Sequence, residues 1–478
     1  NNVSYSDALQ TMSDSPKRIL RRGTVAHGQI EKDVENLSGY GSTDDPKKTP
    51  SAGKLLVRRN TFNEGEQDHK TKFSTWTIDQ DEESMGDISI VINLLADLTP
   101  AGVLPLASGM VGTGYVPSFV LLLLFAGCAA YMMFLISRTM EITGAKSHDK
   151  IWEKCVGYAS SWVPLAVLMS VCFGNCLAYS CMFGDLFSGC MPGFGLSFAT
   201  RTVCILGLSI FPLLPLCMLK DLSALAPTSF GALIAVLYMC VMMGIRYFDG
   251  SYFPGGIYHT EPKWNDHTWN FGIQTLLLVN TLAVGFLCHY NGCKYYREYV
   301  DHRPTKFGGR VGLAFMTVAA IFVASGLFGY ATFGTDSSGV ILNNYSSDDF
   351  LANIARLGMG FANVFSFPLM FSGLRESTCA LLSFLYPENQ DTYDTVLFQN
   401  SLSIVMLAAV TVLAVIVTDA STVVGLVGSI CGIGIIYVIP CFLFVQASET
   451  FLSQGDSSVN PKELLLVKTI GFVGLVLM

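Results

Sequence analysis

The chain contains a succession of apolar segments, each about as long as a lipid bilayer is thick, and this feature limits the fold more than any other. A helix needs about 20 apolar residues to cross the hydrocarbon core. Segments of this kind lie at 88–110, 115–137, 161–187, 202–219, 223–246, 270–291, 309–333, 350–373, 397–418, 421–446 and 463–478. We therefore expect an all-α polytopic membrane protein with eleven spans, the last of them cut off at Met478.

The composition agrees with a membrane protein everywhere except at the N-terminal end. Charged residues make up 14% of the 478 residues and apolar residues 51%, whereas a soluble domain carries about 25% charged residues. Residues 1–87 are instead rich in Ser, Thr, Gly, Asp and Lys, and such a segment cannot bury enough apolar surface to fold. We interpret 1–87 as a disordered cytoplasmic tail and 88–478 as a transmembrane domain that has the lipid bilayer as its partner.

Three short patterns in the tail resemble kinase sites, where a phosphate would add negative charge beside arginines. They are Arg21-Arg22-Gly23-Thr24, Arg58-Arg59-Asn60-Thr61 and Ser15-Pro16-Lys17-Arg18. Chance occurrence in a tail rich in Ser and Thr explains them equally well. Kinases are therefore candidate partners, and a nutrient sensor that signals through the tail is an alternative function.

The Lys and Arg residues of the short loops indicate the orientation of the spans, because cytoplasmic loops carry an excess of them. If the tail is cytoplasmic, the same side holds Arg138, Lys146, Lys150, Lys154, Lys220, Lys294, Arg297, Arg303, Lys306, Arg310, Arg375 and Lys462. The opposite side holds Arg201, Arg246 and Lys263. The charges favour a cytoplasmic N-terminus, and they leave the plasma membrane and a vacuolar or lysosomal membrane both open.

A glycosylation sequon agrees with this orientation. Asn344-Tyr345-Ser346 has the Asn-x-Ser pattern and falls in a predicted loop on the side opposite to the tail. Asn344 is therefore a candidate glycosylation site.

The span at 88–110 is interrupted by Thr99-Pro100-Ala101-Gly102. Proline lacks an N–H, and glycine tolerates unusual dihedral angles, so we expect the helix to break at these residues; a simple proline kink is the alternative. Broken backbone inside a bilayer is tolerated only where it is buried in protein or lines a cavity. Free N–H groups there would bind a carboxylate, and free C=O groups would bind a cation.

Asp97 lies nine residues into this span. An acidic residue at that depth is energetically expensive and marks a functional site by default. We consider it a candidate for ion coupling, either as a proton carrier or as a cation ligand, and a residue at a water-filled cavity is the remaining alternative.

The span at 270–291 is the second one that is interrupted. Gly285 supplies flexibility, so Gly285, Phe286 and Cys288 are candidates to complete a substrate site. His289 titrates near neutral pH and is a candidate for ion coupling, although a packed structural histidine is the more frequent role. Interruptions in spans 1 and 6 predict two five-helix repeats with a binding site between them.

Spans 3 and 8 carry polar side chains at helical spacing. Asn175 and Tyr179 share one helix face and are candidate substrate contacts, with inter-helix hydrogen bonding as an equal alternative. Asn363 and Ser366 are candidate ion ligands. Arg356 is expected to extend outward to the headgroup region.

Other function classes have little support in the sequence. GxSxG, HExxH and Walker motifs are absent from the chain, so we expect neither an enzyme nor an ATP-driven pump, and a channel would need a filter sequence. The 14 cysteines lie mostly in apolar runs, where a free thiol behaves as a small hydrophobe. We expect no metal site, no nucleic-acid partner and no cofactor beyond a bound H⁺ or Na⁺.

Several motifs resemble the amino acid/auxin permease family over about 88–478, especially its neutral amino acid transporters of the sodium-coupled and vacuolar branches. They are Gly285-Phe-Leu-Cys-His289-Tyr-Asn291, Tyr296-Arg-Glu298, Gly326-Leu-Phe-Gly-Tyr330-Ala-Thr-Phe-Gly334, Ile341-Leu-Asn-Asn344-Tyr and Lys220-Asp221-Leu-Ser223. The resemblance implies a leucine-transporter-type inverted repeat with eleven helices, of which helices 1 and 6 are discontinuous. It also implies an amino acid substrate at the two breaks.

The chain departs from this family in span 1. Pro100-Ala101-Gly102 stands where the family usually has Gly-x-Gly, and Ala96 stands where the sodium-coupled branch has an Asn. The hydroxyl that this branch has in span 8 corresponds to Ser366. The resulting hypothesis is an amino acid symporter or exchanger that works by alternating access, in which backbone at 99–102 holds the substrate carboxylate and in which Asp97 makes proton coupling a rival to sodium coupling.

Overall fold

The structure, a computed structural model, describes residues 85–478 except 197, 220–225, 260–268, 418–419 and 453–458. The chain divides into two units, Asn1–Thr71 and Lys72–Met478, and every described residue belongs to the second. The predicted tail lies outside the described residues up to position 84, together with its three kinase-like patterns.

Helices are the regular secondary structure of the described residues, apart from one isolated bridge between Met85 and Tyr299, which confirms the all-α prediction. Each predicted span corresponds to one helix or to one broken pair. These elements are α3 (Asp87–Val103) with α4 (Leu106–Met110), α5 (Tyr115–Thr143), α7 (Trp162–Cys190), α8 (Arg201–Leu208) with α9 (Leu214–Met218), α10 (Ala226–Phe248), α11 (Thr275–Gly285) with α12 (Gly292–Glu298), α13 (Pro304–Phe333), α14 (Phe350–Leu385), α16 (Val396–Ile416), α17 (Ala420–Leu426) with α18 (Ile439–Ala447), and α19 (Pro461–Leu477).

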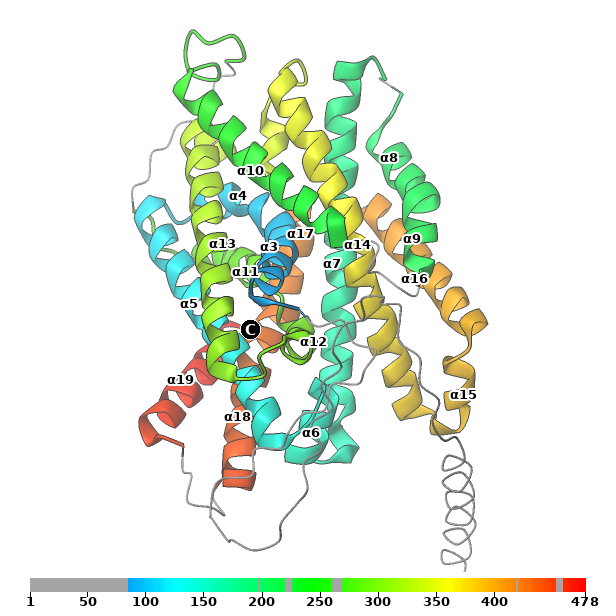
Figure 1. The fold of residues 1–478 in the computed structure, drawn as a ribbon. Helices are drawn as coiled ribbons and strands as arrows, with labels where there is room; N and C mark the ends of the chain where they lie inside the picture. Colours follow the sequence, from blue (N-terminus) through cyan, green and yellow to red (C-terminus); the bar gives the residue numbers. More distant parts are fainter. Residues whose placement is uncertain (1–84, 197, 220–225, 260–268, 418–419, 453–458) are drawn as a thin grey trace, which may run out of the picture. The chain divides into compact units, whose positions relative to one another are not determined.

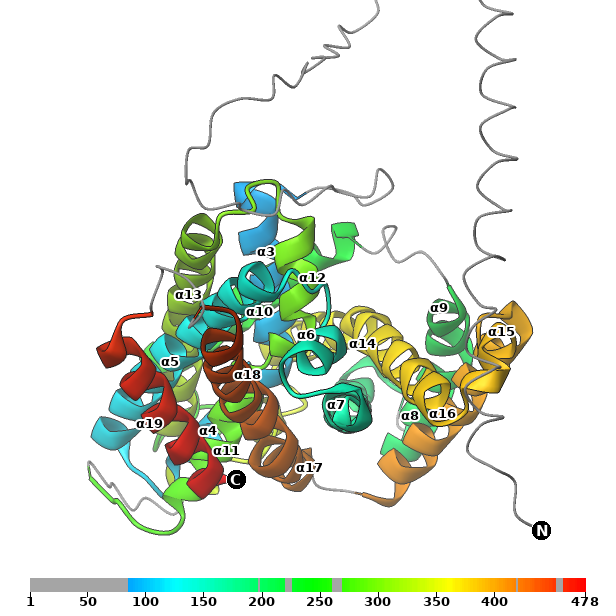
Figure 2. The same ribbon diagram turned by 90° about the horizontal axis from the view of Figure 1, so that it is seen from below.

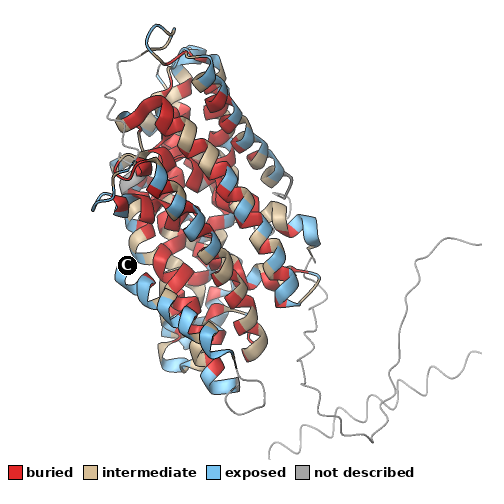
Figure 3. Cartoon of the chain, turned by 90° about the vertical axis from the view of Figure 1, so that its left-hand side faces the viewer, coloured by how far each residue is buried: buried red, intermediate tan, exposed pale blue. Residues whose placement is uncertain are grey.

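Nine helices of the described part are long and apolar enough to cross a membrane. The first span falls outside this set because it is divided between α3, with 17 residues, and α4, with 5 residues. Large apolar side chains remain exposed along the outer faces, among them those of Leu123, Phe211 and Leu397, and Figure 3 shows buried residues concentrated inside the bundle. This distribution is the one expected of helices surrounded by lipid.

The helices form two groups with α7 and α14 between them. Figure 1 and the end-on view in Figure 2 both place α8, α9 and α16 on one side of this pair, and α5, α13 and α19 on the other. A short helix, α6 (His148–Cys155), closes the connection between α5 and α7. We call that end of the bundle the α6 end, and the opposite one the Asn344 end.

The tenth span contains π-helical segments, η10 (Val427–Gly432) and η11 (Gly434–Val438), between α17 and α18. A Cβ on Gly428 would overlap the carbonyl oxygen of Asn280 and lie 3.0 Å from its carbonyl carbon. The backbone of this span therefore packs directly on α11.

The connection between α13 and α14 folds back over the start of α14 at the Asn344 end. Arg356 is 2% exposed and donates hydrogen bonds to the carbonyl oxygen of Leu342 at 2.9 Å, to Asn353 Oδ1 at 2.6 Å and to the carbonyl oxygen of Tyr345. The expectation that Arg356 extends toward the headgroups is wrong, because the folded loop offers carbonyl acceptors that need a buried donor.

The start of α3 is tied to the end of α12. Met85 donates its N–H to the carbonyl oxygen of Glu298 at 2.6 Å, and Val300 donates its N–H to the carbonyl oxygen of Met85 at 3.0 Å. Arg310 of α13 forms an ion pair with Asp87 at 2.6 Å. These contacts join the N-terminal end of the first span to the segment that follows α12.

Candidate functional site

The first span breaks later than the sequence predicts. Helix α3 continues through Pro100 to Val103, and α4 begins at Leu106, so the expectation of a break at Thr99, Pro100, Ala101 and Gly102 is wrong in position. The Thr99 hydroxyl donates to the carbonyl oxygen of Leu95 at 2.8 Å, which adds a hydrogen bond to the turn where Pro100 offers no N–H. Helical backbone at 99–102 has no free N–H group for a substrate carboxylate.

The actual break, at Leu104 and Pro105, leaves main-chain oxygens that neighbouring elements use. The carbonyl oxygen of Val103 accepts a hydrogen bond from Ser325 Oγ of α13 at 3.1 Å. The carbonyl oxygen of Leu104 accepts one from the N–H of Ile341 at 3.1 Å. These two oxygens are satisfied by protein groups in this structure, as buried polar backbone requires.

The sixth span breaks where it was expected to. Helix α11 ends at Gly285, and residues 286–288 connect it to the 3₁₀ turn η6 (His289–Asn291), which leads into α12. The N–H of Phe286 bonds to the carbonyl oxygen of Leu282 at 3.0 Å, which closes the last turn of α11. The discontinuity predicted at Gly285 is therefore confirmed.

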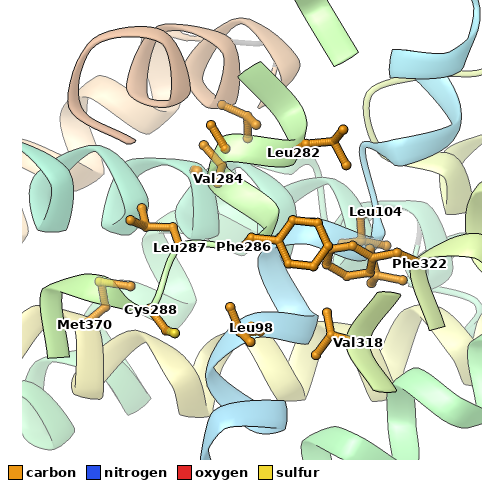
Figure 4. Close-up of a cluster of buried hydrophobic side chains, with 14 of the residues drawn as sticks. Leu98, Leu104, Leu282, Val284, Phe286, Leu287, Cys288, Val318, Phe322 and Met370 are labelled. Carbon is orange, nitrogen blue, oxygen red and sulfur yellow. The ribbon is translucent and has the colours of Figure 1, made fainter. Parts of the chain in front are cut away.

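The two interrupted spans cross with their backbones in contact. A Cβ on Gly102 would lie 2.5 Å from Gly285 Cα and closer still to the Phe322 ring of α13, and a Cβ on Gly285 would lie 2.9 Å from the same ring. Figure 4 shows the Phe286 and Phe322 rings side by side at this crossing, with Leu104 next to them. The α13 side of the crossing is therefore occupied by packed apolar side chains.

The α7 and α14 side of the crossing carries buried polar groups. Asn175 of α7 is 3% exposed, its Nδ2 lies 4.0 Å from Met370 Sδ of α14, and its Oδ1 has no hydrogen-bond partner among the described residues. Figure 4 places Met370 on the same side of the crossing as Leu287 and Cys288. A buried amide oxygen without a partner calls for an explanation such as a ligand or a water molecule, so this side is the candidate substrate site.

Asp97 joins α3 to the region that follows the second break. Its Oδ1 accepts a hydrogen bond from the Tyr290 hydroxyl at 2.6 Å, and its Oδ2 accepts one from the Tyr295 hydroxyl at 2.8 Å. Tyr179 of α7 and Cys288 interact electrostatically with the same carboxylate. The structure thus brings three residues that the sequence singled out, Asp97, Tyr179 and Cys288, to one place.

Sequence reasoning missed both tyrosines. Tyr290 and Tyr295 are five positions apart, and this spacing matches no regular helix face because a 3₁₀ turn precedes α12. The usable signal was Asp97 itself, because a carboxylate inside a membrane needs hydrogen-bond donors from a neighbouring segment.

The other candidates for ion coupling have different surroundings. The His289 ring bonds through Nε2 to the carbonyl oxygen of Ala129 on α5 at 2.9 Å. Asn363 of α14 is 0% exposed, and neither of its amide atoms has a partner in the described part of the chain. Ser366 lies one helical turn further along α14 and is half-buried. Asn363, with both amide atoms unpartnered, and His289, with its Nδ1 unpartnered, are the members of this set for which the described residues supply too few hydrogen-bond partners.

The sequon asparagine is part of the folded loop at the Asn344 end. Asn344 Nδ2 donates to the carbonyl oxygen of Asp336 at 2.8 Å, and its Oδ1 accepts from the N–H of Ser338 at 2.8 Å. Glycosylation of Asn344 stays a prediction.

Membrane-length helices around two discontinuous ones define a class, that of multi-span transporters built on broken helices. A family model confirms this class: the model described as transmembrane amino acid transporter protein matches residues 85–478. The chain belongs to that family, and a transporter of amino acids is not an enzyme.

Several relatives agree with the family. The amino acid transporter AVT6E of Arabidopsis thaliana is 24% identical over 424 residues, which cover 82% of this chain and 83% of the relative. Vacuolar amino acid transporter 5 of Schizosaccharomyces pombe is 26% identical and covers 78% of this chain and 87% of its own length. The putative sodium-coupled neutral amino acid transporter 11 of Mus musculus is 22% identical, with coverages of 77% and 79%.

A solved structure has the same fold. The crystal structure of MhsT in complex with L-phenylalanine has a TM-score of 0.52 to this protein at 12% identity, and the match covers 83% of this chain and 98% of MhsT. At that identity the likeness concerns the fold alone. It supports the leucine-transporter-type fold with discontinuous helices 1 and 6.

Proposed function

We propose that this protein carries amino acids across a membrane by alternating access, driven by a gradient of protons or sodium ions. The observation that carries the proposal is the backbone contact between Gly102 and Gly285, because it joins two broken helices at one point inside the bundle. Substrates of secondary transporters bind beside such breaks, and access alternates by movement of the helices around a fixed site.

The substrate would lie on the α7 and α14 side of this contact, since packed side chains fill the α13 side. Asn175 and Tyr179 would contact it from α7, and Cys288 from the second break. The unpartnered Oδ1 of Asn175 would accept a hydrogen bond from a donor such as the substrate ammonium group. We do not propose backbone at 99–102 as the carboxylate-binding group, because it is helical in this structure.

The membrane and its orientation belong to the same proposal. Relatives named vacuolar and relatives named sodium-coupled both match this chain, so the plasma membrane and a vacuolar or lysosomal membrane remain the two settings. The basic residues favour a cytoplasmic α6 end. The sensor alternative depends on the tail, which lies outside the described residues, and we do not propose it.

The test is uptake of a panel of radiolabelled amino acids into proteoliposomes that contain the full chain. We expect uptake of at least one amino acid to rise when a pH gradient or a sodium gradient is imposed. Absence of uptake and of exchange for every amino acid, under every gradient, would overturn the proposal.

A pair of α7 variants tests the location of the substrate. Asn175→Leu keeps the number and branching of the side-chain heavy atoms but removes the amide, and we expect at least a tenfold loss of kcat/KM, since one hydrogen bond to a charged group contributes about 1.5–3 kcal/mol. Ser170→Ala is the matched control, because Ser170 is exposed on the same helix and bonds to its own turn. Equal kinetics of the two variants would remove Asn175 from the site.

A further inference from the structure

Asp97 and two tyrosines form a bridge between the two broken spans. Each carboxylate oxygen accepts one phenolic hydrogen bond, at 2.6 Å from Tyr290 and at 2.8 Å from Tyr295. Both donors belong to the segment after the second break, η6 and α12, whereas Asp97 belongs to α3. The bridge therefore holds the α6-end half of the sixth span against the first span.

The groups around the carboxylate are donors, and they are neutral. Asn291 adds a third side-chain hydrogen bond, whereas Lys294 interacts with the carboxylate electrostatically and without a hydrogen bond. The Lys294 ammonium forms an ion pair with Glu298 at 4.0 Å. A metal cation needs several oxygen acceptors in its shell, as calcium and magnesium do. Each phenol hydroxyl directs its proton, and not an oxygen lone pair, at the Asp97 carboxylate. The group of Asp97, Tyr290 and Tyr295 is therefore suited to exchange of a proton rather than to binding of Na⁺.

Among the described residues, three groups on α7 and at the second break interact electrostatically with Asp97, and all three are uncharged at neutral pH. They are Tyr179 and Cys172 of α7 and Cys288 of the second break. Asp97 is only half-buried as a residue although it lies well inside α3. An ionisable side chain of this kind inside a membrane is typical of proton relays.

We infer that Asp97 binds the coupling proton and that Tyr290 and Tyr295 transmit its charge state to α12, an inference that rests on the proposed function. A proton from water adds to one carboxylate oxygen, and no other bond forms or breaks. The neutral acid offers its hydroxyl as a donor and accepts more weakly than the carboxylate, because charge-assisted hydrogen bonds are about twice as strong as neutral ones. Loss of that strength loosens α12 from α3, and release of the proton to water on the other side restores the bridge.

A second set of contacts joins the first span to the elements around α12, and it indicates where a movement would begin. Met85 pairs with the segment after α12, and Asp87 pairs with Arg310, at the very end of the two half-helices. The bridge at Asp97 lies ten positions further into α3. If the bridge at Asp97 weakens, the contacts of Met85 and Asp87 still hold the ends of the two half-helices together and act as a pivot. We therefore expect the half-helices to separate first around Asp97.

Infrared difference spectroscopy of the full chain in lipid tests the proton site without any transport measurement. Between pH 8 and pH 5 we expect the carbonyl band of a protonated carboxylic acid to appear in the wild type and to be missing in Asp97→Asn. Tyr290→Phe and Tyr295→Phe each remove one donor to the charged form, so we expect the midpoint of the band to move to higher pH by about one unit. An unchanged band in Asp97→Asn would overturn the inference, as would unshifted midpoints in both tyrosine variants.

A neighbouring tyrosine provides the matched control. The Tyr296 hydroxyl donates to Glu141 Oε1 at 2.9 Å, so Tyr296→Phe removes the same kind of contact from the same helix without touching Asp97. We expect this variant to leave the midpoint within about 0.3 of a pH unit, well inside the one-unit shift expected for the bridge. A shift in Tyr296→Phe equal to that of the other two would mean that the bridge is not the origin of the effect.

Transport measurements separate this inference from the proposed function. In liposomes that exchange amino acids, we expect Asp97→Asn to lose accumulation driven by a pH gradient by more than tenfold, with a smaller loss of exchange. Proton-driven accumulation that survives in Asp97→Asn, or accumulation in the wild type that follows sodium and ignores pH, would sink the inference and leave the transport proposal standing. Liposomes without any exchange, but with the expected carboxyl band, would sink the transport proposal and leave the proton site.

Discussion

At the scale of single residues, the contact between Gly102 and Gly285 places the strictest demand on side-chain size. Overpacking of a filled core typically costs about 1–3 kcal/mol. Because a Cβ on Gly102 would meet both the Phe322 ring and the Gly285 backbone, we expect Gly102→Ala to lose about this much stability. A thermal unfolding measurement in detergent would show it as a lowered Tm.

Gly309 provides the control for this substitution. A Cβ on Gly309 would meet nothing within 4 Å, and alanine is favoured over glycine inside a helix by about 0.5–1 kcal/mol. We therefore expect Gly309→Ala to keep or slightly raise the Tm. A Gly102→Ala protein as stable as Gly309→Ala would show that the crossing is looser than the structure has it.

The sequence predicts some of the candidate residues but not the position of the first break. The sequence indicates Asp97 by its charge inside a span, Tyr179 by the helix face that it shares with Asn175, and Cys288 by the break near Gly285. In the structure, Tyr179 and Cys288 both interact electrostatically with Asp97. The break at Leu104 and Pro105 could not be assigned from the same pattern, since two prolines lie five positions apart and only tertiary contacts decide which of them ends α3. Ser325 and Ile341 supply these contacts from elements far along the chain.

At the scale of elements, the span positions followed from hydropathy, whereas their internal geometry did not. The bilayer fixes the length of a span, so each predicted segment corresponds to a helix or a broken pair. The π-helical turns of the tenth span left no such mark in the sequence, because they arise where Gly428 packs on α11 rather than from local propensity. Helix α14 runs for 36 residues, well past its predicted end, since its last turns need no apolar surface.

The packing of the π-helical segment gives a prediction at this scale. A Cβ on Gly428 would collide with the Asn280 carbonyl group, whereas one on Gly425, in the preceding helix α17, would meet nothing within 4 Å. We expect Gly428→Ala to lose about 1–3 kcal/mol and Gly425→Ala to lose none, as measured by thermal unfolding of the two variants side by side. Equal stability of the pair would argue against a backbone contact between span ten and α11.

At the scale of the whole molecule, the packing of α6 under α12 makes stability depend on pH. His148 of α6 is buried, and its Nδ1 lies 3.4 Å from Cys293 Sγ of α12. Burial lowers the pKa of His148 from 6.5 to about 4. As pH falls below 6.5 the unfolded chain takes up a proton that the folded chain refuses, so the folded state loses stability until the pH reaches about 4.

This dependence is measurable as an acid shift of the Tm. The lowering of the His148 pKa on folding corresponds to a loss of about 3 kcal/mol of stability in acid. We expect His148→Leu to show a smaller fall in Tm between pH 7 and pH 4.5 than the wild type. Ser170→Ala, which changes no titratable group, serves as the control and should keep the wild-type fall. An equal fall in all three proteins would assign the acid sensitivity to other groups.

The π-helical turns of the tenth span also determine how this chain can be aligned with its relatives. A π-turn holds more residues than an α-turn, so a relative with a plain α-helix there reaches the same depth with fewer residues. One position of offset rotates a helical side chain by about 100°, which exchanges a residue that faces α11 for one that faces lipid. At 20 to 26% identity, a sequence alignment beyond Val427 is therefore not enough to assign residue roles, and a structural superposition is needed. Positions then correspond when their side chains lie at the same depth in the membrane and on the same helix face, rather than at the same residue count.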